Sequence, residues 1–353
     1  MKRERKPFGP SVAIAYFLII TLLLSACGVS SNGSSPETGK PSVSNASETN
    51  KPAATDTASP DTASQKLTDV TFVTLPVTDS AMVVLADSQG IFKKNGLNVN
   101  IVKVQTGPAT TSAIVSGAAQ FSQSNYATLI SAKMKGTPIE IVAEAARAQE
   151  GFSAVITGVN SSIKEPKDLL GKRIATAVIG GIGPIAINQW LKDKGIDYTK
   201  INWVQMSFPE MGAALETNRV DAAWVVEPFV TKYTKVKDAK ARVVFDVFSG
   251  PTAKLPIAAY AANENYVKDH PDIVEAFVKS VQEAAALAQK DPTLIKKVLP
   301  SFTSLPEELV NQLSLEEYPS STDIAEIQRV AKAMQDTGVT QTEYKVDSMI
   351  WKK

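Results

Sequence analysis

The stretch from Gly171 to Gly195, GKRIATAVIGGIGPIAINQWLKDKG, limits the possible folds of this chain more than any other stretch. Residues 173–178 alternate and are rich in β-prone types, which predicts a strand, and three glycines then interrupt the pattern. Pro184 suits the first turn of a helix, and Gly195 suits the position just after its end. The sequence therefore predicts a strand, a glycine turn and a helix, the repeating unit of an α/β fold.

The glycine turn has three possible interpretations. The first N–H groups of a helix have no partners and lie at the positive end of its dipole, so Gly180 and Gly181 could receive a small anion or a polar group of a ligand. Gly181, Gly183 and Ala186 also fit the dinucleotide-binding pattern G-x-G-x-x-A. That pattern requires an acidic residue at the end of the next strand, which here ends in Gln205. A purely structural turn is the third interpretation.

The first 26 residues have the pattern of an export signal. Four basic residues precede an apolar run from Val12 to Leu24. The sequence LSAC that ends at Cys27 resembles the lipobox of bacterial lipoproteins, in which cleavage leaves the cysteine as the lipid-modified first residue. We therefore expect residues 1–26 to be a lipoprotein signal peptide and Cys27 to anchor the chain to the membrane. An incidental cysteine at an ordinary cleavage site is the alternative.

Residues 27–66 are almost entirely small or polar, which predicts a disordered tether between the lipid and the folded part of the chain. Cys27 is the only cysteine in the sequence, so the chain can form neither an internal disulfide nor a thiolate metal cluster. Its 37 basic and 36 acidic residues nearly balance, and we therefore expect no nucleic-acid partner.

Strand-like and helix-like segments alternate from residue 70 onward. The predicted strands cover residues 70–75, 96–104, a short segment ending at Phe121, 139–145, 173–178, 201–206 and 222–226. A polar turn at 122–125 is expected after the third strand, and helices are expected between the strands. This alternation predicts a parallel sheet covered on both faces, with ligands at the carboxyl ends of its strands. After Pro251 the pattern predicts bracing helices at 271–289, 306–313 and 324–336.

Three stretches carry a resemblance to a known family: DSAMVVLADSQGIFKKNGLNVNIV, LLGKRIATAVIGGIG and NRVDAAWVVEPF. They resemble the extracytoplasmic solute-binding proteins of ABC importers for alkanesulfonates, nitrate and thiamine-pyrimidine precursors. The resemblance implies a two-lobe, periplasmic-binding-protein-like fold of type II, in which each lobe is a mostly parallel sheet flanked by helices. It also implies that lobe one comprises residues 67–163 and 256–353, that lobe two comprises residues 164–255, and that the lobes close on a ligand.

Turns at the carboxyl ends of the predicted strands should line the cleft between the lobes. The candidate ligand-binding residues in these turns are Thr78, Ser80, Ser124, Asn125, Tyr126, Arg147, Gly180, Gly181, Trp224 and Glu227. The Arg147 guanidinium could hold a carboxylate, sulfonate or phosphate, although an ion pair with an acid of the protein is equally open. Trp224 with Glu227 would suit an amine, a cation or a heterocycle with N–H donors.

Each of the other candidates also has a structural alternative. Trp224 and Tyr126 could belong to the core, Asn125 could serve only the turn, and Glu227 could be a strand-end carboxylate paired to a lysine. Apolar residues surround the glycine turn at positions where the resembled family carries small hydroxyl groups. This difference argues against a tightly held sulfonate or nitrate.

The sequence predicts a binding protein and not an enzyme. The only histidine, His270, lies at a helix start, where exposure to solvent is expected, so histidine-dependent catalysis and a zinc site are unsupported. We expect the protein to need no cofactor. We also expect it to be a monomer on the outer face of the membrane of a Gram-positive-like bacterium. By resemblance, it would capture a small polar organic solute, either alkanesulfonate-like (for example taurine-like) or of the pyrimidine type, and pass it to ABC permease subunits. An exported enzyme or a ligand sensor with the same fold is the alternative.

Overall fold

The computed structural model describes residues 66–353, which belong to one compact unit, Thr62–Lys353. The predicted signal peptide, Cys27 and nearly all of the predicted tether lie outside the described residues. Within residues 66–353, no helix combines the length and the apolar character that crossing a membrane requires.

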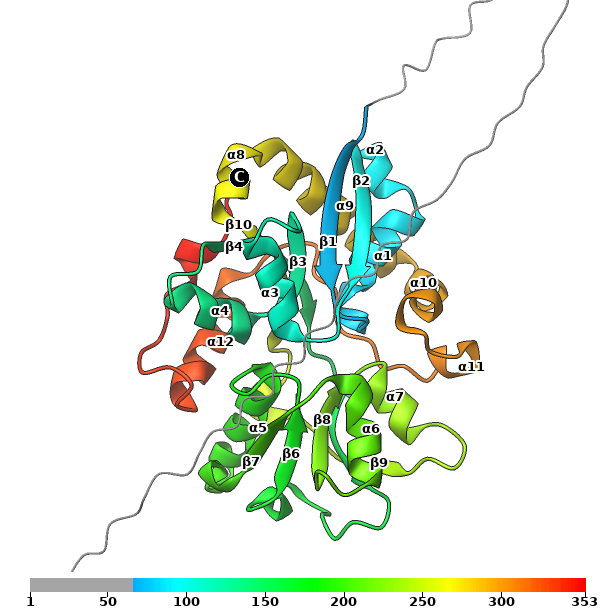
Figure 1. Cartoon of the computed structure of the whole chain (residues 1–353), viewed down its shortest axis with the longest axis vertical. Helices are drawn as coiled ribbons and strands as arrows, with labels where there is room; N and C mark the ends of the chain where they lie inside the picture. The colour runs from blue at the N-terminus through cyan, green and yellow to red at the C-terminus, as the bar shows by residue number, and fades with distance from the viewer. Residues whose placement is uncertain (1–65) are drawn as a thin grey trace, which may run out of the picture. The chain divides into compact units, whose positions relative to one another are not determined.

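The first sheet has five strands in the order β2-β1-β3-β10-β4 (Figure 1). Its strands are β1 (Thr68–Thr74), β2 (Leu97–Lys103), β3 (Phe121–Asn125), β4 (Ile139–Arg147) and β10 (Pro256–Asn263). β1 is parallel to β2 and β3, whereas β10 is antiparallel to both of its neighbours. Four strands therefore run in one direction, and β10 alone runs against them.

The second sheet repeats this arrangement with the order β7-β6-β8-β5-β9. Its strands are β5 (Ser153–Gly158), β6 (Arg173–Thr176), β7 (Asn202–Gln205), β8 (Ala222–Val226) and β9 (Ala241–Asp246). β6 is parallel to β7 and β8, whereas β5 is antiparallel to β8 and β9. Both sheets are thus mixed, with most strands in one direction, which agrees with the predicted fold class.

The reversed strands follow from the way the chain passes between the sheets. One connection leads from the end of β4 to β5, and the other leads from the end of β9 to β10. Each connection leaves one sheet at the carboxyl ends of its forward strands and reaches the other sheet at the carboxyl ends of that sheet's forward strands. The strand that follows the connection must therefore run antiparallel to those forward strands. The forward strands of both sheets therefore have their carboxyl ends at the region between the sheets, as the arrowheads of β1 and β6 show (Figure 1).

Several sequence-based expectations need correction. Residues 122–125, expected to be a turn, belong to strand β3, where three polar side chains are buried between β1 and β10. Strands β5, β9 and β10 were not predicted. Because β5 pairs only within the second sheet, the expectation that residues up to 163 belong to lobe one is wrong for residues 153–158.

Helices flank both sheets and form most of the C-terminal part. Those that follow strands of the first sheet are α1 (Ala81–Ser88), α2 (Ile91–Lys94), α3 (Gly107–Val115), α4 (Tyr126–Met134) and α8 (Glu264–Asp269). Those of the second sheet are α5 (Ile182–Asp193), α6 (Phe208–Glu216) and α7 (Phe229–Thr234). The C-terminal helices are α9 (Pro271–Lys290), α10 (Thr293–Thr303), α11 (Glu307–Val310) and α12 (Ile324–Asp336). The predicted helices at 271–289 and 324–336 are confirmed, and α11 is shorter than predicted.

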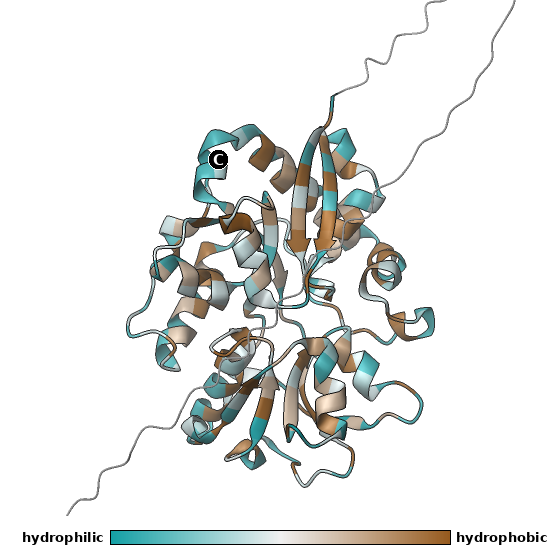
Figure 2. Ribbon diagram, in the orientation of Figure 1, coloured by the Kyte–Doolittle hydropathy of each residue, from teal (hydrophilic) through white to brown (hydrophobic). Residues whose placement is uncertain are grey.

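Aromatic rings from α9, α2 and the first sheet form the centre of one core. The Phe277 ring of α9 stacks on the Phe121 ring of β3 with centroids 4.0 Å apart, and it contacts Phe72, Phe92 and Tyr260 at 5.7 to 5.9 Å. Such ring pairs add to the stability gained by burying their large apolar surfaces. Figure 2 shows hydrophobic residues along β1 and β2 and hydrophilic residues on the outlying helix α8. The packing of these rings holds strands β1, β3 and β10 in fixed positions relative to α9.

Candidate functional site

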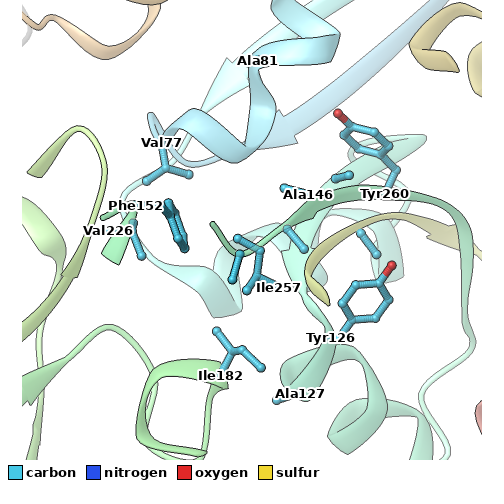
Figure 3. Packing of buried hydrophobic residues seen from close by; sticks show 14 of the residues in the cluster. Val77, Ala81, Tyr126, Ala127, Ala146, Phe152, Ile182, Val226, Ile257 and Tyr260 are labelled. Atoms are coloured by element: carbon cyan, nitrogen blue, oxygen red, sulfur yellow. The ribbon is translucent and has the colours of Figure 1, made fainter. Parts of the chain in front are cut away.

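An apolar cavity of about 60 Å³ lies at the carboxyl ends of the strands, and both sheets contribute to its walls. The first sheet and its loops contribute Leu75, Val77, Asp79, Gly107, Gln123, Ser124, Asn125 and Ile257. The second sheet and its loops contribute Phe152, Ala177, Val178, Gly181, Ile182, Phe208, Trp224, Val226 and Phe248. Figure 3 shows Val77, Phe152, Val226, Ile182 and Ile257 approaching one another around this space.

Four aromatic side chains form the wall contributed by the second sheet. The Phe152 and Phe248 rings lie 5.8 Å apart, and the Phe208 and Trp224 rings lie 5.7 Å apart. The indole Nε1 of Trp224 donates a 2.8 Å hydrogen bond to the Ser153 hydroxyl, so its polar edge is satisfied inside the sheet. This pairing leaves the ring surface as the part of Trp224 that the cavity can use.

The glycine turn fits against this tryptophan. A Cβ atom on Gly183 would lie only 2.2 Å from the Trp224 ring, so α5 can approach the ring only with glycine at this position. Gly180 has φ +73°, a left-handed conformation that glycine adopts without strain. The turn is therefore shaped for close packing on Trp224, and Gly181 lines the cavity while Gly180 lies outside its wall.

Asp79 is the charged group of the cavity wall. It is 9% exposed, and its Oδ2 accepts a 3.2 Å hydrogen bond from the Gln123 side-chain amide. The Gln123 Oε1 accepts a 3.0 Å bond from the Thr74 hydroxyl, which fixes the direction of the amide and turns its NH₂ group toward Asp79. Thr74 also contacts the Ser80 hydroxyl. Within the described residues, no N–H or hydroxyl group donates a hydrogen bond to the Asp79 Oδ1.

Glu316 lies behind Asp79 and forms a buried acid pair with it. Glu316 accepts hydrogen bonds from the Thr78 hydroxyl at 2.6 Å and from the Tyr318 hydroxyl at 2.9 Å. Burial first, and then the charge of Asp79, raise the pKa of Glu316 well above its ordinary value. Burial also raises the pKa of Asp79, but a hydrogen bond with Glu316 opposes this effect. We assign the proton of the pair to Glu316 and the negative charge to Asp79.

The β3 end contributes neutral polar groups. Ser124 is 2% exposed, lines the cavity, and has no hydrogen-bond partner for its hydroxyl within residues 66–353. Asn125 also lines the cavity, while its Oδ1 caps α4 by accepting a 2.9 Å bond from the Thr128 N–H. Tyr126 is fully buried behind this wall and does not line the cavity. The core alternative for Tyr126 therefore describes its position.

Arg147 is engaged by another residue of the protein. Its Nε and Nη2 donate to the two Glu144 carboxylate oxygens at 2.6 and 2.9 Å, and burial together with this pairing accounts for the shifts in both groups. The side-chain hydrogen bond with Glu144 raises the pKa of Arg147, and burial raises the pKa of Glu144. Arg147 is not among the residues that line the cavity. The ion-pair alternative thus describes the structure, with Glu144 as the acid.

Glu227 is buried beside the cavity without lining it. It is 1% exposed, and its carboxylate accepts bonds from the Thr231 N–H at 3.0 Å and the Thr231 hydroxyl at 2.8 Å. The Ser314 N–H donates to it at 3.3 Å from the C-terminal part of the chain. Burial raises the pKa of Glu227 to about 7, against these hydrogen bonds. Glu227 therefore connects the first turn of α7, through Thr231, to the C-terminal part of the chain, through Ser314.

With this geometry established, comparison with known proteins places the chain in a family. The family model described as NMT1/THI5 like matches residues 77–294. The chain belongs to the NMT1/THI5-like family. The matched stretch begins in the turn that carries Asp79 and ends just beyond α9, so it includes nearly all of the cavity wall.

Relatives of this NMT1/THI5-like chain include both binding proteins and enzymes. It is 27% identical over 216 residues to the taurine-binding periplasmic protein of Escherichia coli, a match that covers 61% of this chain and 65% of that protein. It is 24% identical over 249 residues to a 4-amino-5-hydroxymethyl-2-methylpyrimidine phosphate synthase, THI11, of Saccharomyces cerevisiae, covering 67% of this chain and 70% of the enzyme.

A solved structure shows the same fold. The alkanesulfonate-binding protein SsuA of Xanthomonas axonopodis, bound to MOPS, superposes with a TM-score of 0.69 at 17% identity, covering 80% of this chain and 98% of that one. The predicted family resemblance and the periplasmic-binding-protein-like fold are confirmed. In this NMT1/THI5-like chain the cavity lies at the carboxyl ends of the strands, which is where open α/β sheets usually bind ligands.

The predicted site residues divide into two groups. Those that line the cavity are Ser124, Asn125, Gly181 and Trp224. Those that lie outside its wall are Thr78, Ser80, Tyr126, Arg147, Gly180 and Glu227. Thr78 and Ser80 nevertheless contact the groups that hold Asp79 and Glu316 in place.

Five residues of the cavity wall were not among the predicted binding residues: Asp79, Gln123 and the three phenylalanines of the aromatic wall. Asp79 lies between the predicted residues Thr78 and Ser80, so the signal for it was a carboxylate in a turn already assigned to the cleft. Phe152 and Phe248 lie on the two connections between the sheets, whose course depends on the unpredicted strands β5, β9 and β10. No local pattern in the sequence indicates that these two rings face each other.

Proposed function

We propose that the chain is the substrate-binding protein of an ABC importer and that it captures a small polar organic solute between two lobes. The observation that carries the proposal is the cavity at the strand ends, because residues of both sheets contribute to its wall. A site made from two bodies can bind and release a ligand when they move relative to each other.

The relatives support the class of function and give two candidates for the solute. One relative is named for binding taurine, and the SsuA structure is titled as an alkanesulfonate-binding protein. The yeast relative is named for a reaction that forms a pyrimidine phosphate. We therefore propose a taurine-like or pyrimidine-type solute, which an aromatic wall facing polar groups of the first sheet could hold.

We further propose that the protein acts outside the cytoplasm as a lipid-anchored monomer. The apolar signal, the LSAC sequence ending at Cys27 and the polar stretch after it support this part of the proposal. The partners would be the permease subunits of the importer and the membrane that holds the lipid. In this proposal lobe two extends from about residue 150 to about residue 252, since β5 to β9 form its sheet.

An enzyme is the second candidate function, because one group of relatives is named as synthases. Asp79 is the only ionisable side chain among the described residues that line the cavity. General acid–base chemistry could use that one carboxylate, whereas the proposed capture and release of a solute requires no reacting group.

The test of the proposed function is a thermal-shift screen of alkanesulfonates, taurine, pyrimidines and small amines, because a ligand that binds only the folded state stabilises it. A hit is then incubated with the protein, and mass spectrometry identifies the bound molecule. Recovery of the unchanged solute, together with protein-dependent uptake of it by cells, is the expected result. A converted product would instead establish the enzyme, and uptake that is unaffected by loss of the protein would reject the import role.

A further inference from the structure

The cavity combines a buried carboxylate with a wall that contains no positive charge. Asp79 lines the cavity at 9% exposure, and within residues 66–353 its carboxylate bonds to the Gln123 amide and to the acid Glu316, neither of which is positively charged. None of the described residues that line the cavity is lysine, arginine or histidine. Buried charges in proteins are normally paired with the opposite charge, so a buried carboxylate that has no positively charged partner at a cavity wall favours a ligand that brings this charge.

The groups packed behind Asp79 do not supply that charge. They are Glu316, Tyr318 and Tyr260, which are all acidic or neutral and all buried. Burial first, and then the nearby acids, raise the pKa of each tyrosine above its ordinary value, so both hydroxyls stay neutral. Glu316 keeps its proton, as described above. The negative charge that we assign to the acid pair therefore lies on Asp79, and no group behind it neutralises this charge.

The opposite wall has the character of an aromatic cage. Phe152, Phe208, Trp224 and Phe248 line the cavity together. The faces of aromatic rings carry negative potential and attract cations, and quaternary ammonium groups are recognised by cages of this kind. On the side of Asp79, the unpartnered Ser124 hydroxyl adds a further oxygen that can accept a hydrogen bond from a ligand.

We propose that the ligand of this cavity carries a positively charged nitrogen, which lies between the Asp79 carboxylate and the aromatic wall, and that the site discriminates against sulfonates and nitrate that lack such a group. This inference rests on the proposed binding function and specifies the class of solute. A volume of about 60 Å³ corresponds to roughly four to six water-sized groups, so the part of the ligand in the cavity is a small organic cation.

The test compares three probes of equal size and different charge: tetramethylammonium, tert-butanol and methanesulfonate. The full chain is purified in detergent, and affinities are measured by calorimetry at constant ionic strength. We expect tetramethylammonium to bind at least about tenfold more tightly than either of the other probes, because a carboxylate and ring faces both favour the cation. Tighter binding of methanesulfonate, or no binding of tetramethylammonium, overturns the inference.

The Asp79→Asn variant tests the carboxylate, with Asp87→Asn as the matched control. Asp87 lies on α1, the helix that follows Asp79, and is exposed to solvent. Asparagine keeps the shape of the side chain and removes the buried charge, so the variant should unfold at a higher temperature than the wild type while its affinity for tetramethylammonium falls about tenfold or more. Asp87→Asn should change neither property. Unchanged affinity in Asp79→Asn contradicts the proposal.

A measurement on the unmodified protein keeps the proposal testable if Asp79→Asn does not fold. The charge of tetramethylammonium is independent of pH, so any loss of affinity on acidification reports on the protein. Binding should weaken as Asp79 becomes protonated, and because burial raises the pKa of Asp79 above its ordinary value, this loss should begin above the pH at which an exposed aspartate titrates. An affinity that stays constant down to acid unfolding rejects the role of Asp79.

These outcomes separate the inference from the proposed function. If methanesulfonate or another sulfonate binds and is imported, the transport function stands and the cation preference is wrong. If a cation binds but loss of the protein leaves its uptake unchanged, the site is correct and the import role fails.

Discussion

At the scale of single residues, Glu227 should make the stability of the protein depend on pH. Burial raises its pKa to about 7 in the folded state, compared with 4.5 for an unperturbed glutamate. The folded state therefore binds the proton more tightly than the unfolded state, and stability decreases as pH rises from about 4.5 to about 7. The full effect is roughly 3.5 kcal/mol, because the shift is about 2.5 pKa units and each unit contributes about 1.4 kcal/mol.

Glu227→Gln should remove this contribution. We expect the free energy of unfolding, measured by urea denaturation across that pH range, to fall less steeply in the variant than in the wild type. Asp79, Glu144 and Glu316 also have raised pKa values and add slopes of the same sign, so the difference between the two proteins is the quantity to compare. Parallel curves for the two proteins would show that Glu227 is not the group that titrates.

The position of Arg147 illustrates what sequence reasoning at this scale could not foresee. In a regular strand Glu144 and Arg147 would lie on opposite faces, because side chains alternate. The register between β4 and β10 shifts here, with Ala258 opposite Ala146 but Ala259 opposite Glu144. The extra residue in β4 resets the alternation and lets the two side chains pair. Such irregularities depend on the neighbouring strand, so the sequence of β4 alone does not predict them.

At the scale of elements, the contact between α5 and Trp224 predicts that Gly183→Ala is destabilising. The added Cβ would lie 2.2 to 2.4 Å from three atoms of the indole ring, so either the helix or the ring must move. Overpacking of this kind typically costs about 1–3 kcal/mol. Because Trp224 lines the cavity, ligand affinity should also fall.

Gly158→Ala is the control for that substitution. Gly158 ends β5, and a Cβ there would meet no atom within 4 Å, so chemical denaturation should show little change in the free energy of unfolding. If Gly183→Ala were as stable as Gly158→Ala and bound ligand normally, the contact between α5 and Trp224 would be looser than the structure shows, and the prediction would be wrong.

Secondary structure was predictable where strands and helices alternate clearly, and less so elsewhere. The strand at 222–226 and the helix at 324–336 have the predicted bounds. Strand β10 escaped prediction because its alanines have low β propensity, and it is stabilised by β3 and β4 on either side. The SQSN segment of β3 resembled a turn because its residues are polar. In the structure, however, Gln123 hydrogen-bonds to Thr74 and Asp79, and Ser124 and Asn125 line the cavity.

At the scale of the whole molecule, the proposed membrane anchor can be tested at Cys27. A lipid attached there would hold the protein to the membrane, so Cys27→Ser should release the protein from the membrane fraction into the medium. Immunoblotting of the two fractions measures the result. A variant that is processed at the same position and still fractionates with the membrane would disprove anchoring through this cysteine.

A second prediction at this scale is that the protein contracts when it binds its solute. The cavity wall is shared between the sheets, so a ligand that contacts both walls should favour the closed arrangement. Small-angle X-ray scattering of a chain that starts at residue 66 should give a smaller radius of gyration with saturating ligand than without it. Equal values under the two conditions would count against closure.

The reversed strands β5 and β10 have a mechanical consequence. Each lies inside its sheet, with β5 between β8 and β9 and β10 between β3 and β4, so a hydrogen-bond ladder clamps it on both sides. A force that a connection exerts on such a strand is shared with the two neighbouring strands, whereas a strand at the edge of a sheet could separate from its single neighbour. Backbone motion should then concentrate in the connections 148–152 and 247–255, which would act as hinges while each sheet moves as a rigid body. Amide hydrogen exchange should accordingly be fast in these two short segments and slow in the strands they join.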